Sequence, residues 1–141
     1  MKDVAYIALG SNLGQREVFL AQARRAIAGL AKTRVIGQTD AEETAPIGPI
    51  AQGPFLNQMV AIETELSPQD LLAALKRIEE DAGRVRMTRW GPRTLDLDIV
   101  LFEKQSVHDA GLTVPHPELA NREFWLRELA TLRTALSMLA W

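Results

Sequence analysis

Residues 93–102 read Arg-Thr-Leu-Asp-Leu-Asp-Ile-Val-Leu-Phe, and apolar side chains alternate with acidic ones through most of this segment. A period of two residues is typical of a β-strand, because successive side chains of a strand point to opposite faces of its sheet. The pattern predicts a strand over 95–102 that places Asp96 and Asp98 together on one face. The opposite, buried face would carry Leu95, Leu97, Ile99 and Leu101.

Short apolar runs and helical periodicities on both sides of this strand predict the remaining elements. Ser67-Pro68 marks a helix start, with serine as the cap and proline in the first turn, and Gly83 is expected to end that helix. In chain order we expect a strand over 4–9, a helix capped by Ser11 or Asn12 and reaching Leu30, strands near 34–37 and over 57–65, the helix at 67–83, the strand over 95–102 and a short strand over 112–114.

Two loops and a C-terminal helix complete the prediction. Prolines and glycines make 45–54 a loop, and 84–93 is a second one. The last segment has a heptad-like apolar stripe, which indicates a helix packed on the domain, with pairing to a partner helix as the alternative. That stripe is Trp125, Leu129, Leu132, Leu136 and Leu139.

The order strand, helix, strand, repeated once, predicts a ferredoxin-like α+β sandwich, with a mainly antiparallel sheet and helices packed on it. A length of 141 residues with 47% hydrophobic composition fits one domain over 1–141. The net charge of -2 argues against a general polyanion binder, and the absence of cysteine excludes thiolate chemistry and sulfur-bound zinc. The N-terminal apolar run is too short for a signal peptide, so we expect a cytoplasmic protein without membrane partners.

The aspartate pair is the strongest candidate for chemistry. Two strand rises place the Cα atoms of Asp96 and Asp98 roughly 6.5 Å apart, so that their oxygens can converge on one hard cation or bracket two. Oxygen ligands without nearby histidine or cysteine favour magnesium or manganese over zinc. The alternative is an amphipathic strand whose aspartates merely face water. Like charges on one face of a strand repel, however, so the pair needs a metal ion or nearby cations to offset its charge.

Arginines gather immediately before the strand, around Trp90. Guanidinium groups match phosphate oxygens in a bidentate fashion, so a loop that carries them could close over a polyphosphate held by the aspartates through metal. The alternative is a solvated basic loop paired with the acidic residues of 79–81. The arginines are Arg84, Arg86, Arg89 and Arg93.

Two further motifs are weaker when taken alone. Gly10-Ser11-Asn12-Leu13-Gly14 follows a strand and could point backbone amides at an anion, or could simply form a tight turn. Val114-Pro115-His116-Pro117 fixes a histidine in a rigid turn, where the imidazole could donate to a phosphate oxygen or bond to backbone. Phe55, Asn57 and Phe124 give no signal by themselves, because aromatic residues are more often core than binding platforms.

Taken together, these motifs resemble those of the hydroxymethyldihydropterin pyrophosphokinases of folate synthesis. The resemblance spans residues 4 to about 126 and rests mainly on RWGPRTLDLDI, with GSNLG, FLN and TVPHP in support. It implies a ferredoxin-like fold, ATP as co-substrate, and transfer of the β,γ-diphosphate to 6-hydroxymethyl-7,8-dihydropterin with release of AMP.

The resemblance also implies a role for individual residues. Asp96 and Asp98 would ligate two Mg²⁺ ions, with either Asp98 or a metal-bound water taking the hydroxyl proton, and Arg84 and Arg93 would neutralise phosphate charge. The nucleotide side would further involve Glu79, Arg86, Arg89, Trp90, Ile99, Thr113, His116 and Arg122. The pterin side would involve Thr44, Ala45, Pro46, Phe55, Asn57, Trp90 and Phe124.

The sequence departs from the family pattern at three places. It runs without proline from Trp125 to the end, it has Lys76 and Gly111 where some members place glutamine and arginine, and its arginine loop is slightly shorter. A nucleic-acid-binding module is the alternative from another class, and a catalytically inactive paralogue is a third. Against the nucleic-acid-binding module, the sequence lacks the RNA-recognition consensus. Against the inactive paralogue, both aspartates are intact. We expect small-molecule substrates and a monomer.

Overall fold

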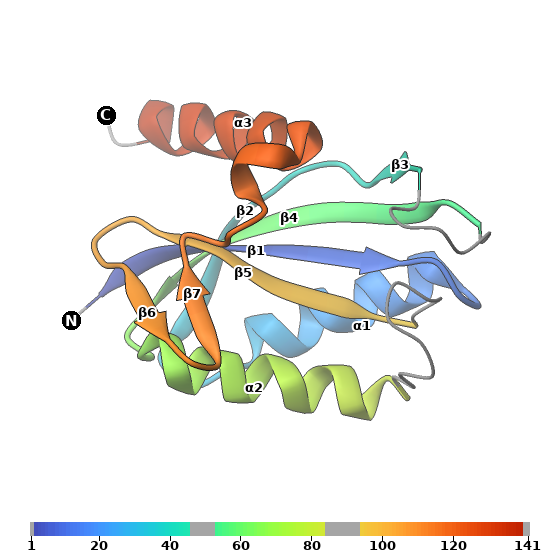
Figure 1. Cartoon of the computed structure of the whole chain (residues 1–141), viewed down its shortest axis with the longest axis horizontal. Coiled ribbons are helices and arrows are strands. Elements are labelled where there is room, and N and C mark those ends of the chain that lie inside the picture. Colours follow the sequence, from blue (N-terminus) through green and yellow to red (C-terminus); the bar gives the residue numbers. More distant parts are fainter. Residues whose placement is uncertain (1, 46–52, 84–93, 140–141) are drawn as a thin grey trace.

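The computed structural model describes residues 2–45, 53–83 and 94–139, which form an antiparallel sheet with helices on both faces (Figure 1). The predicted positions Pro46, Arg84, Arg86, Arg89, Trp90 and Arg93 lie outside the described residues. In chain order the elements are β1 Asp3–Ser11, α1 Arg16–Ala28, β2 Thr33–Gln38, β3 Glu42–Thr44, β4 Phe55–Thr64, α2 Pro68–Asp81, β5 Asp96–Phe102, β6 Val107–Asp109, β7 Leu112–Val114, a 3-10 turn Leu119–Asn121 and α3 Glu123–Leu139.

The main sheet has the strand order β2-β4-β1-β5, and β3 pairs with the N-terminal end of β4. Every pairing is antiparallel, and the connections β1-α1-β2 and β4-α2-β5 repeat the same unit. This is the ferredoxin-like arrangement, so the predicted fold is confirmed. The strand β5 occupies one edge of the sheet, and the hairpin β6-β7 lies beside it.

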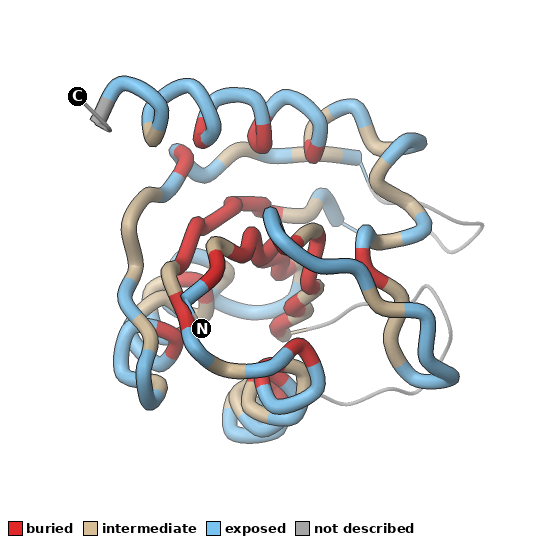
Figure 2. The backbone as a smooth tube through the Cα atoms, turned by 90° about the vertical axis from the view of Figure 1, so that its left-hand side faces the viewer, coloured by how far each residue is buried: buried red, intermediate tan, exposed pale blue. Residues whose placement is uncertain are grey.

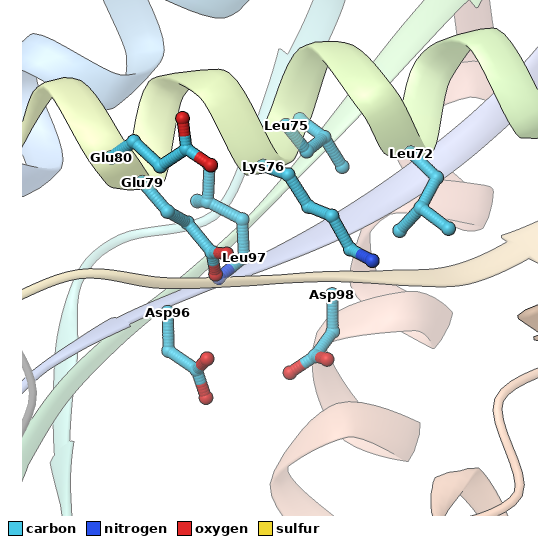
Figure 3. A pocket seen from close by; sticks show the side chains of 8 residues that line it. All are labelled: Leu72, Leu75, Lys76, Glu79, Glu80, Asp96, Leu97 and Asp98. Carbon is cyan, nitrogen blue, oxygen red and sulfur yellow. The ribbon is translucent and has the colours of Figure 1, made fainter. Parts of the chain in front are cut away.

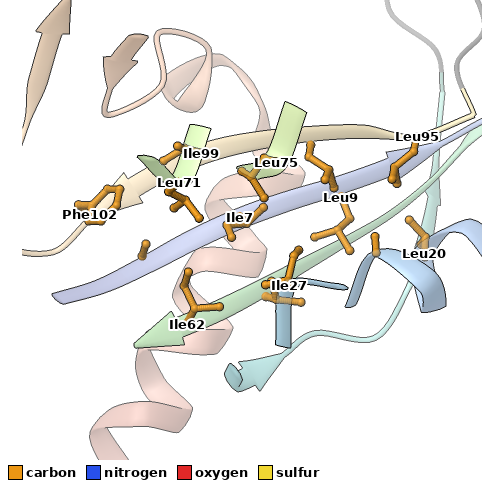
Figure 4. Close-up of a cluster of buried hydrophobic side chains, with 14 of the residues drawn as sticks. Ile7, Leu9, Leu20, Ile27, Ile62, Leu71, Leu75, Leu95, Ile99 and Phe102 are labelled. Atoms are coloured by element: carbon orange, nitrogen blue, oxygen red, sulfur yellow. The ribbon is translucent and has the colours of Figure 1, made fainter. Parts of the chain in front are cut away.

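Helices α1 and α2 cover one face of the sheet over the larger hydrophobic core (Figures 1 and 4). The helix α2 begins as predicted, because the Ser67 hydroxyl accepts the backbone N–H of Asp70 and Pro68 occupies the first turn. Gly83, which follows the helix, has a φ of 74°, a value that favours glycine. The largest fully buried side chains of this core include Ile7, Leu9, Leu20, Ile27, Ile62, Leu71, Leu75, Leu95 and Phe102.

The helix α3 packs on the opposite face over a second, smaller core. Buried positions recur along the side of α3 that faces the sheet (Figure 2). Trp125, Leu129 and Leu132 are buried there against Tyr6 and Met59. The prediction of a helix packed on its own domain is confirmed. Among the described residues, none of the helices combines the length and the apolar character needed to cross a bilayer.

The strict alternation expected along β5 stops at a β-bulge. Tyr6 pairs with Leu101 and Ile7 pairs with Ile99, so Val100 is an extra residue in β5. Val100 lies in the smaller core and Leu101 packs against that core too, whereas Leu95, Leu97, Ile99 and Phe102 belong to the larger one. The prediction that Leu101 shares the face of Leu97 is wrong, because the bulge places the consecutive residues Val100 and Leu101 on the same face.

The first helix begins later than predicted. Neither Ser11 nor Asn12 caps it; the helix begins at Arg16, and its N-terminal flanking residue Gln15 makes no side-chain cap. Ser11 remains in the ladder, opposite Leu56 of β4, and it is fully buried. The turn between strand and helix includes Gly14, with a φ of 75°. The short strands β3 and β6 are additional to the predicted elements, and β7 lies where it was expected.

Candidate active site

One end of the sheet, on the face that carries α3, brings the predicted site residues together. The register places Asp96, Gly10 and Asn57 side by side across β5, β1 and β4, with Glu42 of β3 next in the row. Two residues farther along β5 stands Asp98, opposite Ala8. Because residues that are directly opposite share a face, these side chains border one surface at the sheet end.

Asp96 and Asp98 project from the same face of β5. Figure 3 shows both carboxylates pointing away from α2, while Leu97 between them points to the opposite side. Both aspartates are half-buried, whereas Leu95, Leu97 and Ile99 are buried in the larger core. The face predicted for the pair is therefore confirmed.

His116 faces Asp98, with its Nε2 atom 3.6 Å from Asp98 Oδ1. Two backbone contacts fix the ring: the His116 N–H donates to the Val100 carbonyl at 2.8 Å, and Nδ1 accepts the Glu118 N–H at 3.0 Å. Since Nδ1 acts as an acceptor, a neutral ring carries its proton on Nε2, toward Asp98. The bulge at Val100 thus links the position of the histidine to that of the aspartate.

Arg122 and Phe124 flank the start of α3 close to this histidine. The guanidinium carbon of Arg122 lies 4.3 Å from the centroid of the Trp125 ring, and the His116 ring meets the same indole edge to face at 4.9 Å. Phe124 is half-buried and makes an edge contact with Trp125 at 6.2 Å. His116, Arg122 and Phe124 therefore all contact one buried residue, Trp125.

Asn57, Thr44 and Phe55 form the other side of the surface. Asn57 is buried, and its Nδ2 donates to the Thr44 hydroxyl and, at 3.4 Å, to the Phe55 carbonyl. Gly10 leaves room for them, since a Cβ atom there would lie 3.3 Å from Asn57 Oδ1 and 3.5 Å from the Phe55 ring. The first glycine of GSNLG therefore has a packing reason that the motif alone did not reveal.

Glu79 lies on the outer edge of β5 rather than on the α3 face. Its Oε2 accepts the Leu97 N–H at 2.7 Å, which satisfies an amide on the edge strand of the sheet that the described residues form. A hollow of about 340 Å³ lies between α2 and this edge. Its lining residues are Leu72, Leu75, Lys76, Glu79, Glu80, Asp96, Leu97 and Asp98 (Figure 3).

Three other predicted residues do not present their side chains to this surface as clearly. The Ile99 side chain is buried in the core on the far face, so only its backbone can reach a ligand. Thr113 is half-buried in β7 opposite His108, and Ala45 is exposed just after β3.

Glu128 is a buried acid near this site that the sequence did not single out. It is only 4% exposed, and neither carboxylate oxygen has a hydrogen-bond partner in the described part of the chain. Burial, followed by the negative charge of Glu42, raises the pKa of Glu128 to about 8, and the positive charge of Arg127 opposes this. Arg127 itself pairs with Glu42 at 3.0 Å, so this ion pair connects α3 to β3 beside Glu128. A glutamate in an amphipathic helix carries no signal of burial in its sequence alone.

The donor set at the sheet end suits a hard divalent cation that is shared with a substrate. Within residues 2–45, 53–83 and 94–139 no three acidic or histidine residues form a complete metal cage. Magnesium commonly binds to one or two carboxylates and takes its other ligands from phosphates and water. Two half-buried aspartates on one face therefore fit such an ion.

The fold and the site together define a ferredoxin-like sandwich that presents two carboxylates, a histidine and an arginine at one sheet end. The chain belongs to the family of 7,8-dihydro-6-hydroxymethylpterin-pyrophosphokinases, whose family model matches residues 6–134. The resemblance inferred from the motifs is thereby confirmed.

Individual relatives agree with this membership. The chain is 45% identical over 130 residues to the 2-amino-4-hydroxy-6-hydroxymethyldihydropteridine pyrophosphokinase of Bacillus subtilis, a match that covers 92% of this chain and 78% of the relative. It is 47% identical over 120 residues to the protein of the same name from Haemophilus influenzae, covering 85% and 75%. A solved structure titled as HPPK-DHPS in complex with substrates superposes with a TM-score of 0.66 over 89% of this chain and 39% of that one; at 14% identity it supports the fold alone.

Proposed function

We propose that this chain transfers the β,γ-diphosphate of ATP to 6-hydroxymethyl-7,8-dihydropterin, giving AMP and the pterin diphosphate, as a step of folate biosynthesis. Family membership is the basis for the reaction. The observation that carries the proposal at the level of the site is the pair Asp96 and Asp98 on one face of β5, with His116 Nε2 3.6 Å from Asp98.

The proposed metal is Mg²⁺, two ions held by Asp96 and Asp98. When bound, these ions would neutralise negative charge on the triphosphate and orient it toward the attacking oxygen. The chain supplies the two carboxylates, and their half-buried setting strengthens the attraction for a cation relative to fully hydrated side chains.

In the reaction the hydroxymethyl oxygen forms a bond to the β-phosphorus of ATP, and the bond between that phosphorus and the α,β-bridging oxygen breaks. The hydroxyl proton is lost and AMP leaves with the bridging oxygen. This chemistry depends mainly on positioning and charge neutralisation. Asp98 is one candidate to accept the proton, and a metal-bound water is the other.

The residues around the pair divide into two sides. On the nucleotide side, His116 and Arg122 would contact phosphates, joined by Arg84, Arg86, Arg89, Trp90 and Arg93 from the segment outside the described residues. The hollow beside Lys76 and Glu79 would take the rest of the nucleotide. Ile99, through its backbone, and Thr113 are further residues proposed for the nucleotide side. On the pterin side, Phe55 and Phe124 would hold the ring between them, and Asn57 with the backbone of 44–46 would read its polar edge.

The proposal further includes one domain over 1–141 that acts as a monomer in the cytoplasm on small molecules, with neither nucleic acid nor membrane as partner. Light scattering at working concentration tests the monomer: a mass near 15.6 kDa supports it, and twice that mass contradicts it.

Analysis of the products tests the reaction most simply. The protein is incubated with ATP, Mg²⁺ and the dihydropterin alcohol, and the nucleotides are separated. AMP that appears only when the pterin is present supports diphosphate transfer. ADP as the product, or nucleotide turnover that does not depend on the pterin, contradicts the proposal. A parallel incubation with EDTA tests the requirement for a divalent ion.

A further inference from the structure

Two groups assigned to the nucleotide phosphates rest on a single side chain, that of Trp125. The His116 ring contacts the indole at 4.9 Å with an interplanar angle of 88°, and the Arg122 guanidinium carbon lies 4.3 Å from the indole centroid. Trp125 is itself 2% exposed and packed among Tyr6, Met59 and Val100 in the smaller core. The indole is therefore a rigid surface that contacts both groups.

The Arg122 side chain depends on this contact more than is usual for an arginine. Its Nε is buried and has no hydrogen-bond partner, and no ion pair joins Arg122 to a carboxylate of the described residues. A guanidinium over an aromatic face is attracted by the negative charge of the ring face, and the attraction grows where water is excluded. The tryptophan thus holds the guanidinium without neutralising its charge, which stays available to an anion.

His116 has a different set of supports. Its backbone N–H is held by the Val100 carbonyl and its Nδ1 by the Glu118 N–H, so the indole contact adds a constraint on the tilt of the ring. The backbone N–H of Trp125 donates to the Arg122 carbonyl at 3.0 Å, so the tryptophan and the arginine are also tied within the first turn of α3. One residue thereby fixes the spacing between the arginine and the histidine.

We infer that Trp125 is a positioning residue that sets the arrangement of His116 and Arg122 for the nucleotide triphosphate. The inference rests on the proposed function, because it takes from it the role of these two groups. It predicts that loss of the indole weakens binding of the triphosphate more than binding of the pterin, because the pterin side meets the indole only through the edge contact of Phe124 at 6.2 Å.

The test compares Trp125→Leu and Trp125→Phe with Leu132→Ala. Leu132 is equally buried, lies on the same helix and belongs to the same core, but contacts neither His116 nor Arg122 in the interactions described above. The affinities for Mg²⁺ with a non-hydrolysable ATP analogue, for Mg²⁺ with inorganic tripolyphosphate, and for the pterin alcohol are measured by calorimetry. The His116 imidazole is followed by NMR.

For Trp125→Leu we expect both triphosphate probes to bind about tenfold more weakly, from the loss of the contacts with His116 and Arg122, and a smaller loss of pterin affinity, from the single edge contact with Phe124. Trp125→Phe should show an intermediate but measurable loss, because it keeps a smaller ring face. Leu132→Ala should lower the melting temperature with triphosphate affinity unchanged. In Trp125→Leu the His116 resonances should shift.

The inference is overturned if Trp125→Leu binds tripolyphosphate as tightly as wild type does, or if Leu132→Ala weakens it equally. If the leucine variant does not fold, Trp125→Phe decides. In Trp125→Phe, a measurable loss of triphosphate affinity together with displaced His116 resonances supports the inference. A triphosphate affinity and His116 resonances equal to those of wild type reject it. Failure of the proposed function looks different, because wild-type protein would then yield no AMP.

Discussion

The backbone N–H of His116 donates to the carbonyl of Val100, and Val100 is the extra residue of the bulge in β5. The bulge follows Asp98 by two positions, so a single irregularity of the edge strand anchors the histidine turn next to the aspartate pair. Bulges commonly redirect side chains next to active sites. The geometry of the site therefore originates in the backbone of β5, and the loop that carries His116 is attached to it.

Gly10 is expected to control the pterin side of the site. A methyl group from Gly10→Ala would lie 3.3 Å from Asn57 Oδ1, so it should push Asn57 away from Thr44. We expect the KM for the pterin to rise about tenfold, at a stability cost of roughly 1–2 kcal/mol, with the KM for ATP unchanged.

Gly37→Ala provides the matched control for this change. It also lies in a strand and has a nearest contact of 3.3 Å, but that contact is with Leu132. This variant should lose comparable stability with normal pterin kinetics. Equal effects of the two substitutions on the pterin KM would contradict the assignment of Asn57.

Glu128 should make the protein less stable as pH rises. Its pKa is about 8 in the folded protein against an ordinary value of 4.5, so the folded state binds the proton more tightly than the unfolded state. The contribution of protonated Glu128 to the free energy of unfolding is complete below pH 4.5 and is lost progressively as pH rises to about 8. Glu128→Gln should therefore be more stable than wild type at pH 9 by on the order of 1–3 kcal/mol, and nearly equal to it at pH 4.5.

Denaturant unfolding at several pH values measures this difference. The exposed Glu65→Gln serves as control and should follow the wild-type pH profile. A constant difference between Glu128→Gln and wild type across the range would show that Glu128 does not titrate abnormally.

Glu103 should stabilise the attachment of α3 at the far end of the helix. Its carboxylate accepts hydrogen bonds from the Tyr6 hydroxyl at 2.8 Å and from Arg133 Nη2 at 2.6 Å, and the bond from Arg133 is the largest cause of its lowered pKa. A lowered pKa means stability that is present above the unfolded pKa and is lost as pH falls. Glu103→Gln should lower the free energy of unfolding at pH 7 by about 1 kcal/mol, with activity retained. The control Arg34→Gln, which breaks an exposed ion pair, should leave the free energy of unfolding almost unchanged.

Several features of the fold and of the candidate site could be predicted from local sequence. The serine and proline at the start of α2 act within one turn, and the alternation of β5 directly places Asp96 and Asp98 on one face, so short-range rules suffice for them. The motif VPHP indicates a fixed histidine, although its proximity to Asp98 needs the pairing of distant segments.

Other features depend on contacts that no local pattern encodes. Ser11 looks like a helix cap, yet it remains in a ladder with Leu56, which lies 45 residues further along the chain. The bulge at Val100 interrupts an otherwise apolar run, and β3 has three residues without a recognisable alternation. The burial of Glu128 and the bond from Leu97 to Glu79 arise only when helices dock on the sheet.

Removal of either aspartate charge should affect turnover far more than folding. Asp96→Asn and Asp98→Asn keep the size of the side chain and are half-buried at the surface of the sheet, so we expect melting temperatures close to that of wild type. Turnover should fall at least about 100-fold, because the lost charge matters most in the transition state. Wild-type kcat in either variant would remove that residue from the chemistry.

The binding of Mn²⁺, as a spectroscopic substitute for Mg²⁺, tests most directly whether the two aspartates hold the metal. Electron paramagnetic resonance counts the ions bound to wild type, Asp96→Asn and Asp98→Asn in the presence of a non-hydrolysable ATP analogue, with the free analogue subtracted. We predict two ions per chain for wild type and a loss of at least one in each variant. Undiminished Mn²⁺ binding in both variants would contradict the central assignment.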